Sequence, residues 1–511
     1  MIEFDKVEGA FSLLTSSMEA WIWLIPGLLI GLFFGAMPGI SITMAMAIFL
    51  PMTLYMDFLP AIIFLTAIYT AAGFGGSVPA VLMNIPGTTS AVATTFDGYP
   101  MARSGRHNEA LGIALAASVF GTLVSYMLLM FLIAPVSRIV LKLGPLEMFF
   151  VAVWGMLLIG SLAGKSMMRG LLAGTFGVLL GTVGFSSAGF NRGTMGVPWL
   201  FDGVPVIPAM MGLLAASQLL GLINTKYLIE DDSARKISFR KIVGGMVEAF
   251  RHKAIVVRGA IIGVLVGAIP GVGSSISNLL SYAETKRNAP DGDTFGTGNP
   301  KGVIAAESAN SSSEGGAMAT MLALGIPGGG ATAILLAAFA MNNIVGGPSF
   351  IANQMDVVYA IIFANFAQAV LLLIVGLGFV YIAGYVVRVP LRFLIPSVLV
   401  VATFGSYAIE GSAAGPITLV VFAVLGWAMM RYQYPVAATV VGLLLGRLLE
   451  NELARTFQIG RQSIEGVFNY ALTRPGAMTI LALMLLSIAI SAIAKERNRR
   501  RGLRILDNKS V

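Results

Sequence analysis

Long apolar runs separated by short charged stretches dominate this sequence. Uncharged runs lie between Glu19 and Asp57, between Asp57 and Asp97, and between Glu314 and Asp356, and shorter ones occur along the rest of the chain. Each of these three runs contains a Pro-Gly pair and is too long for one straight crossing. Because a helix needs about 20 apolar residues to cross a bilayer, the pattern predicts an all-α polytopic membrane protein with roughly ten to fourteen membrane segments. We expect re-entrant or broken helical hairpins at the Pro-Gly pairs.

The helix breaks occur at matching places in two halves of the chain. Proline lacks a backbone donor and glycine readily adopts positive φ, so a helix is expected to stop at each Pro-Gly pair. Irregular backbone within a bilayer is tolerated only where it is buried or lines a cavity. Paired breaks in two halves therefore point to a transporter site. The matching segments are 31–41 (GLFFGAMPGIS) with 263–275, 75–89 with 315–329, and 97–100 with 345–348.

The charges of the loops predict that the two repeats are inverted. Positive residues near membrane ends favour the cytoplasmic side. In the first half the loop around Asp57 carries no Lys or Arg, whereas the loop after Pro100 carries two. In the second half the order is reversed, because 282–301 carries three and 341–356 carries none. Equivalent loops are therefore expected on opposite sides of the membrane.

These patterns divide the chain into four parts. We expect a first membrane repeat at 1–225, a basic cytoplasmic linker at 226–258, a second membrane repeat at 259–494 and a basic cytoplasmic tail at 495–511. Within the linker, 237–250 mixes apolar and basic residues and favours an interfacial helix. The same charge rule places the acidic N-terminus in the periplasm and the C-terminus in the cytoplasm of a multi-pass inner-membrane protein.

Composition narrows the function class. Hydrophobic residues make up 57% of the chain and charged residues only 11%, whereas a soluble domain has about a quarter charged. The formal net charge of +8 comes largely from the linker and the tail, so the lipid bilayer is the expected partner and nucleic acid is not needed to explain it. There is no cysteine and there are two histidines, both in polar loops, which disfavours an enzyme. A channel would require a continuous polar stripe or a ring of like charge, which the sequence lacks.

The helix breaks carry groups suited to an anion. A helix that restarts after a break directs unpaired N–H groups and a positive dipole end into the gap. These motifs contain no Lys or Arg, so a carboxylate there would be bound by amides and hydroxyls, with a co-transported cation balancing its charge. The alternative is that the glycines and prolines only allow close helix packing. The candidate substrate-binding residues are Pro38, Gly39, Ser41, Thr43, Asn84, Thr88, Thr89, Gly271, Gly273, Ser274, Ser275 and Gly328.

A second group of polar residues predicts a site for the coupling cation. Glu307, Asn310 and Glu314 have i, i+3, i+7 spacing and share one helix face. A carboxylate within the membrane costs about 3 kcal/mol and usually lines an aqueous path or a relay. The alternative is that this helix end stays in an aqueous entrance after Lys301. We expect Glu307 and Asn310 to bind Na⁺ or H⁺, with no other metal or cofactor. Asp97 is a further candidate, although it also suits a helix cap or a turn.

At these residues the chain resembles the large membrane (permease) subunit of the tripartite tricarboxylate transporters. Three positions depart from the family's usual residues, namely Ser311 for a second Asn, Thr320 for Pro and Gly329 for Ser, which leaves the cation site and the substrate open. The motifs that carry the resemblance are 31–41, 75–77 with 84–90, 95–100 (TFDGYP), 307–310 (ESAN) and 324–328 (LGIPG).

The resemblance implies a secondary active transporter subunit that imports di- or tricarboxylates with a Na⁺ or H⁺ gradient. It also implies a small membrane subunit and a periplasmic solute-binding protein as partners. An elevator-like movement follows only from fold analogy. A carboxylate channel and a stand-alone symporter without a binding protein remain the alternatives, and whether the chain forms a homo-oligomer is left open.

Overall fold

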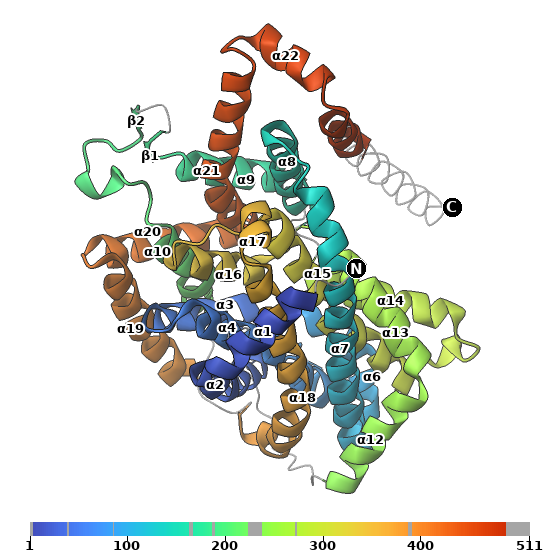
Figure 1. Ribbon diagram of the computed structural model, residues 1–511. Helices are drawn as coiled ribbons and strands as arrows, with labels where there is room; N and C mark the ends of the chain where they lie inside the picture. The colour runs from blue at the N-terminus through green and yellow to red at the C-terminus, as the bar shows by residue number, and fades with distance from the viewer. Residues whose placement is uncertain are drawn as a thin grey trace, which may run out of the picture.

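The computed structural model is almost entirely helical (Figure 1). It describes residues 4–37, 40–84, 86–162, 167–186, 190–222, 238–270, 273–386 and 391–486. In these ranges the only strands are β1 (Gly184–Phe185) and β2 (Asn191–Arg192), which form a short antiparallel pair. The expectation of an all-α protein is confirmed.

The helices of the first half are α1 (Phe4–Ser16), α2 (Met18–Gly35), α3 (Ile42–Phe49), α4 (Phe58–Gly75), α5 (Ser77–Met83), α6 (Val92–Met101), α7 (His107–Val140), α8 (Pro145–Leu162), α9 (Met167–Gly181), α10 (Val206–Met211) and α11 (Ser217–Leu222). Short 3₁₀ or π-helical segments join some of them: η1 (Leu50–Tyr55), η2 (Thr89–Ala91), η3 (Ala102–Arg106), η4 (Pro198–Leu200) and η5 (Gly212–Ala216).

The helices of the second half are α12 (Phe239–Arg251), α13 (Lys253–Gly267), α14 (Gly273–Asn288), α15 (Pro300–Leu324), α16 (Gly330–Met341), α17 (Pro348–Asn353), α18 (Met355–Val386), α19 (Leu391–Glu410), α20 (Ala414–Arg431), α21 (Val436–Ile459) and α22 (Ile464–Leu472), with the turn η6 (Gly292–Thr294).

The helices end at the breaks that the sequence predicts. α2 and α3 are separate helices, as are α13 and α14, α5 and α6, and α15 and α16. α5 ends at Asn84 in the left-handed conformation (φ 60°), and α15 ends at Gly325 in the same conformation (φ 69°). Glycine reaches that conformation without the clash a side chain would cause, so Gly325 is suited to end a helix at this point.

Two helix pairs have the same packing, which supports the internal duplication. α2 packs against α4 and α13 packs against α15, in each case through glycines at every fourth position. A side chain on any of these glycines would press against the facing helix, so the backbones lie in direct contact. The pairs of glycine and facing residue are Gly27–Phe64, Gly31–Ile68 and Gly35–Ala72 in the first half, and Gly259–Ala305, Gly263–Ala309 and Gly267–Ser313 in the second.

Helices α1 and α12 have similar contacts. α1 packs against α18, where Gly9 faces Asp356, and α12 packs against α7, where Gly245 faces Glu109. The expected helix in the linker is therefore present as α12. It lies within 226–258, and its contact with α7 resembles the contact of α1 with α18. Its buried face contacts protein, and its interfacial location stays a prediction.

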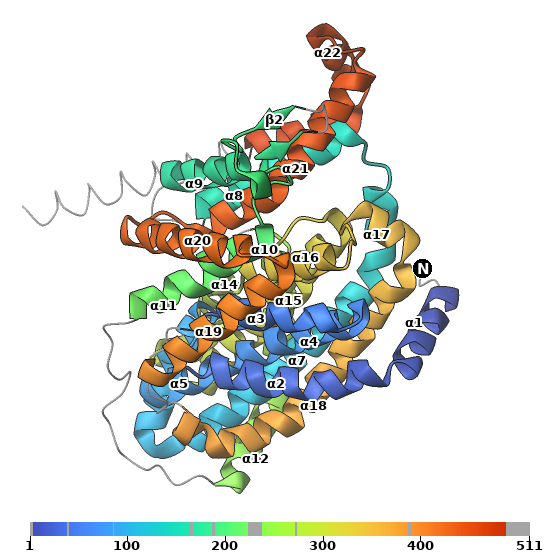
Figure 2. The same ribbon diagram turned by 90° about the vertical axis from the view of Figure 1, so that its left-hand side faces the viewer.

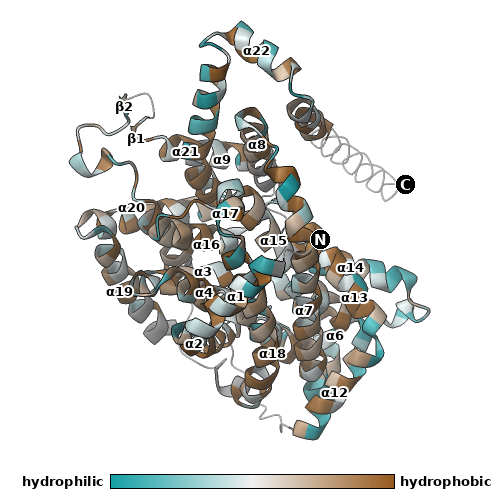
Figure 3. Ribbon diagram, viewed as in Figure 1, coloured by the Kyte–Doolittle hydropathy of each residue, from teal (hydrophilic) through white to brown (hydrophobic). Residues whose placement is uncertain are grey.

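The arrangement is that of a membrane protein. Helices α8, α9, α20 and α21 gather at one end of the molecule, above a body that contains α2, α4, α7 and α18 (Figure 2). Apolar residues cover most of the helices, and polar ones gather on α12 and toward α22 (Figure 3). Among the described residues, five helices are long and apolar enough to cross a membrane, and further apolar helices are shorter. The number of crossing segments stays a prediction.

Candidate functional site

α15 carries a row of buried polar side chains through the middle of the molecule. Glu307 is 0% exposed, and Asn310 and Glu314 are 3% exposed each. α15 is surrounded by α4, α6, α7, α13 and α14. The expected common face exists, and it is turned toward helices of the first half. An exposed helix end after Lys301 does not fit this burial.

The Glu307 carboxylate is held by hydroxyl groups from two helices of the first half. Thr94 of α6 donates to Oε1, and Ser118 of α7 donates to Oε2 at 2.9 Å. Ser77 and Asn310 lie beside the same carboxylate. The buried Ser77 Oγ makes no hydrogen bond of standard geometry. Glu307 is therefore surrounded by side-chain oxygen atoms, which are the ligands that hard cations prefer.

Glu314, two turns further along α15, has different partners. Its Oε1 accepts from Thr70 of α4 at 2.6 Å and from Tyr126 of α7 at 2.7 Å. Across the part of the chain that the structure describes, neither Glu307 nor Glu314 forms an ion pair with Lys, Arg or His. An unpaired charge is expensive to bury, so a proton or a bound cation would stabilise either carboxylate.

α4 and α15 run antiparallel where they meet. Glu314 accepts from Thr70, and Asn310 Nδ2 donates to the carbonyl oxygen of Gly73 at 3.3 Å. The residue number therefore rises along one helix as it falls along the other. Each of these two helices also faces a helix with glycines at every fourth position.

Asp97 fastens a loop of the second half to α6. Its Oδ1 accepts from the backbone N–H groups of Gly296, Gly298 and Asn299 at 2.8 to 2.9 Å, and its Oδ2 accepts from the Tyr282 hydroxyl at 2.9 Å. All these partners are donors, so the geometry favours the cap and turn interpretation over a cation ligand.

The loop that Asp97 holds is also tied within itself. Lys301 Nζ and Asp291 Oδ1 are 2.8 Å apart, and Asn299 donates to the other oxygen of Asp291. The hydrogen bonds from Lys301 and Asn299 hold the pKa of Asp291 below its usual range. Both contacts join Asp291 to residues at the start of α15.

The tips of the broken helices meet across the two halves. Ser41 caps α3 by accepting from the N–H of Met44 at 3.1 Å, and Thr43 lies against Gly330 at the start of α16. On the other side, Asn278 of α14 donates to the carbonyl oxygen of Ser90. Each pair joins one tip of the first half to one tip of the second.

The remaining candidates lie near these tips or outside the described residues. Thr88 bonds to Ser90 at 2.9 Å, and Asn84 is exposed. Gly328 lies against the carbonyl oxygen of Gly267, as Gly87 lies against that of Gly35. Gly273 begins α14. Pro38, Gly39 and Gly271 are outside the described residues, as are the side chains of Thr89, Ser274 and Ser275.

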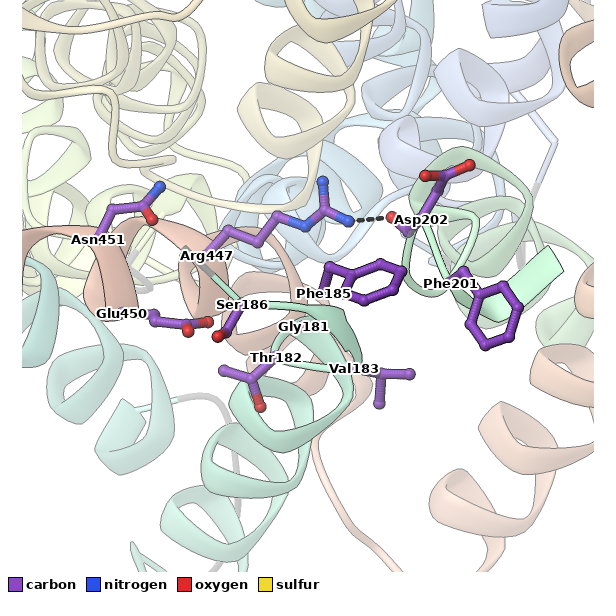
Figure 4. A pocket seen from close by; sticks show the side chains of 10 residues that line it. All are labelled: Gly181, Thr182, Val183, Phe185, Ser186, Phe201, Asp202, Arg447, Glu450 and Asn451. Atoms are coloured by element: carbon purple, nitrogen blue, oxygen red, sulfur yellow. Dashed lines mark hydrogen bonds between the residues drawn. The ribbon is translucent and has the colours of Figure 1, made fainter. Parts of the chain in front are cut away.

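A separate pocket lies between the β1–β2 segment and α21 (Figure 4). It has a volume of about 350 Å³, and Arg447 extends across it to the carbonyl oxygen of Asp202. Glu450 on its wall pairs with Arg192 at 2.6 Å. Glu450, one of the two acidic residues that line the pocket, is thus already neutralised, unlike Glu307 and Glu314.

Sequence reasoning missed the partners of the carboxylates. These residues lie in largely apolar stretches, where a hydroxyl or an amide does not reveal its partner: Thr70, Thr94, Ser118, Tyr126 and Gln368. One signal was present: Ser118, Thr122 and Ser125 recur on one face of α7. These three side chains are completely buried.

The structure thus defines a class of protein: an all-α polytopic membrane protein with broken helices and with buried carboxylates that no described basic residue neutralises. The chain belongs to the tripartite tricarboxylate transporter TctA family, whose model matches residues 21–441. This confirms the resemblance found in the sequence. The chain is therefore a transporter subunit in a family of transporters, not of enzymes, with a carboxylate substrate and partner subunits.

Two similar proteins come from Agrobacterium vitis. One is an uncharacterised 52.8 kDa protein in the TAR-I ttuC' 3' region, 32% identical over 483 residues that cover 94% of each chain. The other is an uncharacterised protein in the TAR-II ttuC' 3' region, 29% identical over 238 residues, 47% of this chain and 97% of that protein. No solved structure matches.

Proposed function

We propose that this chain is the membrane subunit of a cation-coupled importer of di- and tricarboxylates in the bacterial inner membrane. It receives its substrate from a periplasmic solute-binding protein and works with a small membrane subunit. Its N-terminus lies in the periplasm and its C-terminus in the cytoplasm. Family membership and the distribution of Lys and Arg among the loops support this assignment.

The observation that carries the coupling is the burial of Glu307 without a basic partner. A Na⁺ or H⁺ bound there would remove the cost of the buried charge, and Asn310 adds a second group beside it. The carboxylate, hydroxyl and amide oxygens fit either ion. Asp97 serves this site indirectly, by holding the loop before α15.

The substrate binds at the tips of the broken helices. Ser41 and Thr43 at the start of α3, and Thr88 in the facing break, provide hydroxyl groups there. The start of α16 after Gly328 directs backbone N–H groups toward the same region. A carboxylate held by these donors would carry a negative charge that the ion at Glu307 offsets.

Alternating access follows from two inverted repeats, 1–225 and 259–494, separated by the linker 226–258. The antiparallel crossing of α4 and α15 supports the inversion, because equivalent helices of inverted repeats run in opposite directions. The paired tips would move together as one body against the helices around α8, α9, α20 and α21, in an elevator-like manner.

Reconstituted vesicles test this function. The chain, its small subunit and the soluble binding protein are purified, and uptake of radiolabelled citrate and succinate is measured under a Na⁺ gradient and under a pH gradient. We expect accumulation under at least one gradient, and little uptake when the binding protein is left out. Equilibration without accumulation under both gradients would favour a channel, and fast accumulation without the binding protein would favour a stand-alone symporter.

A further inference from the structure

We propose that Glu314 is a second ion site, separate from Glu307, and that it binds an exchangeable proton, with Thr70 and Gln368 arranged to hydrogen-bond both its charged and its neutral form. This inference deepens the proposed function, because it assigns the proton a place of its own in the coupling machinery. It rests on the orientation of three side chains from α15, α4 and α18.

Hydrogen bonds fix which end of the Gln368 side-chain amide is the nitrogen and which is the oxygen. Its Nε2 donates to the carbonyl oxygen of Ile63 at 3.0 Å and to Thr66 Oγ1 at 2.9 Å. A backbone carbonyl only accepts, so the nitrogen must face α4 at this point. The carbonyl oxygen of Gln368 consequently faces Thr70, whose Oγ1 lies 3.5 Å away.

Thr70 has two acceptors for one hydrogen atom. Its Oγ1 lies 2.6 Å from Glu314 Oε1 and 3.5 Å from Gln368 Oε1. When Glu314 is charged, the Thr70 hydroxyl donates to the carboxylate. When Glu314 takes up a proton from water, its new O–H donates to Thr70 Oγ1, and the Thr70 hydrogen turns to Gln368 Oε1. The proton is simply added and removed, and the Thr70 hydroxyl has an acceptor in both states.

The packing around Glu314 favours a proton over a metal ion. The next two residues, Gly315 and Gly316, lie against Ser125 of α7 and against the backbone of Val264 in α13, with no room for a Cβ. Both hydroxyls that contact Glu314 donate to the same oxygen, Oε1, whereas at Glu307 the hydroxyls are divided between the two carboxylate oxygens and Ser77 Oγ lies beside them. Glu307 therefore offers more lone pairs to a cation than Glu314 does. A proton occupies no additional volume.

The surroundings of Glu314 contain few titratable groups. Tyr126 of α7 donates to it and Tyr69 of α4 lies near it, and a tyrosine with its ordinary pKa of about 10 is neutral at pH 7. The charged residues of α7, α13 and α18 lie toward the ends of those helices, several turns from this point: His107, Glu109, Arg138, Lys253, Arg258 and Asp356. Glu307 is two turns away on α15, with its own partners.

Infrared difference spectroscopy on the purified chain tests the proposal without any substrate. The C=O stretch of a protonated carboxyl group is followed from mildly acidic to mildly alkaline pH, in water and in D₂O. We expect one titrating band in the wild type that is lost in Glu314→Gln and kept in Glu307→Gln. A Glu314→Gln spectrum that matches the wild type throughout the titration would overturn the proposal.

A second pair of variants keeps the test decisive if Glu314→Gln does not fold. Gln368→Leu removes the acceptor that Thr70 uses only when Glu314 is protonated, so the proton should bind about fivefold more weakly, as expected for one lost hydrogen bond. Thr70→Ser keeps the hydroxyl and should titrate like the wild type. An unchanged midpoint in Gln368→Leu would reject the role of this acceptor. Because no transport is measured, this outcome is independent of the proposed import.

Discussion

Helices α4 and α15 are packed in the same way, and they carry different chemistry. Each is contacted by glycines at every fourth position of a neighbouring helix, α2 for α4 and α13 for α15. α4 is apolar apart from hydroxyl groups such as those of Thr66 and Thr70, whereas α15 contains Glu307, Asn310 and Glu314. The comparison shows that packing and charge are carried by separate residues: the glycines of α2 and α13 build the helix pairs, and Glu307 and Glu314 of α15 bring the charge.

The difference between α4 and α15 also bears on where the hydrogen-bond donors to the carboxylates lie. The carboxylates of α15 have hydroxyl donors from α4, α6 and α7, all in the first half. The first half therefore supplies the hydroxyl donors to both carboxylates of α15. A site shared in this way would be sensitive to any movement between the halves, which is what coupling requires.

Adding a side chain to a packing glycine of α2 or of α13 should disrupt the helix pair that the glycine belongs to. Gly31→Leu and Gly263→Leu would each press a side chain into the backbone of the facing helix, so both variants should lose most of their folded protein. Size-exclusion chromatography in detergent measures this loss. Gly378→Leu on α18 is the matched control, because a Cβ there has no neighbour within 4 Å. Normal folding of either core variant would show that the two pairs are not equivalent.

Asp97 joins the two halves through hydrogen bonds that have no counterpart in the shared glycine packing. In Asp97→Ala, three backbone N–H groups and the Tyr282 hydroxyl lose their acceptor. We expect a loss of about 3 kcal/mol of stability, measured by thermal unfolding, with gradient dependence intact in the protein that remains folded. Asp293→Ala, on the exposed surface of the same loop, should be neutral. A stable Asp97→Ala protein without gradient dependence would instead show that Asp97 is part of the coupling site.

The smallest expected effect is a difference in stability between glycine variants of α1 and of α12. In Gly245→Ala the new methyl group meets the backbone of Glu109, whereas in Gly9→Ala it meets the Asp356 side chain at 3.3 Å, which can shift. Gly245→Ala should therefore lower stability by about 1 kcal/mol, and Gly9→Ala by less. Thermal unfolding of the two variants side by side checks this order. The reverse order would mean that α1 is the more tightly held of the two helices.

Local chemistry made much of the fold predictable. The Ile-Pro-Gly and Pro-Gly segments end helices because of properties of Pro and Gly that no tertiary contact changes, and Gly325 shows the expected left-handed backbone. The spacing of Glu307, Asn310 and Glu314 fixes their common face in any α-helix. The sequence also contained the glycine repeats that pair α2 with α4.

The partners of these side chains could not be predicted in the same way. Thr94, Ser118, Tyr126 and Gln368 reach the site only because α6, α7 and α18 pack around α15 and α4, and a hydroxyl in an apolar helix gives no sign of its partner. The bonds from Asp97 to a loop about 200 residues away depend on the same long-range packing.

Uptake of citrate by vesicles that contain the wild type or Glu307→Gln, with both partner subunits present, tests the central claim most directly. Removing the charge should lower accumulation driven by a Na⁺ or pH gradient at least about tenfold, equal to roughly 1.4 kcal/mol of coupling free energy. Glu465→Gln on the exposed face of α22 should accumulate citrate as the wild type does. Wild-type accumulation by Glu307→Gln under both gradients would contradict the role of this buried carboxylate as the coupling site.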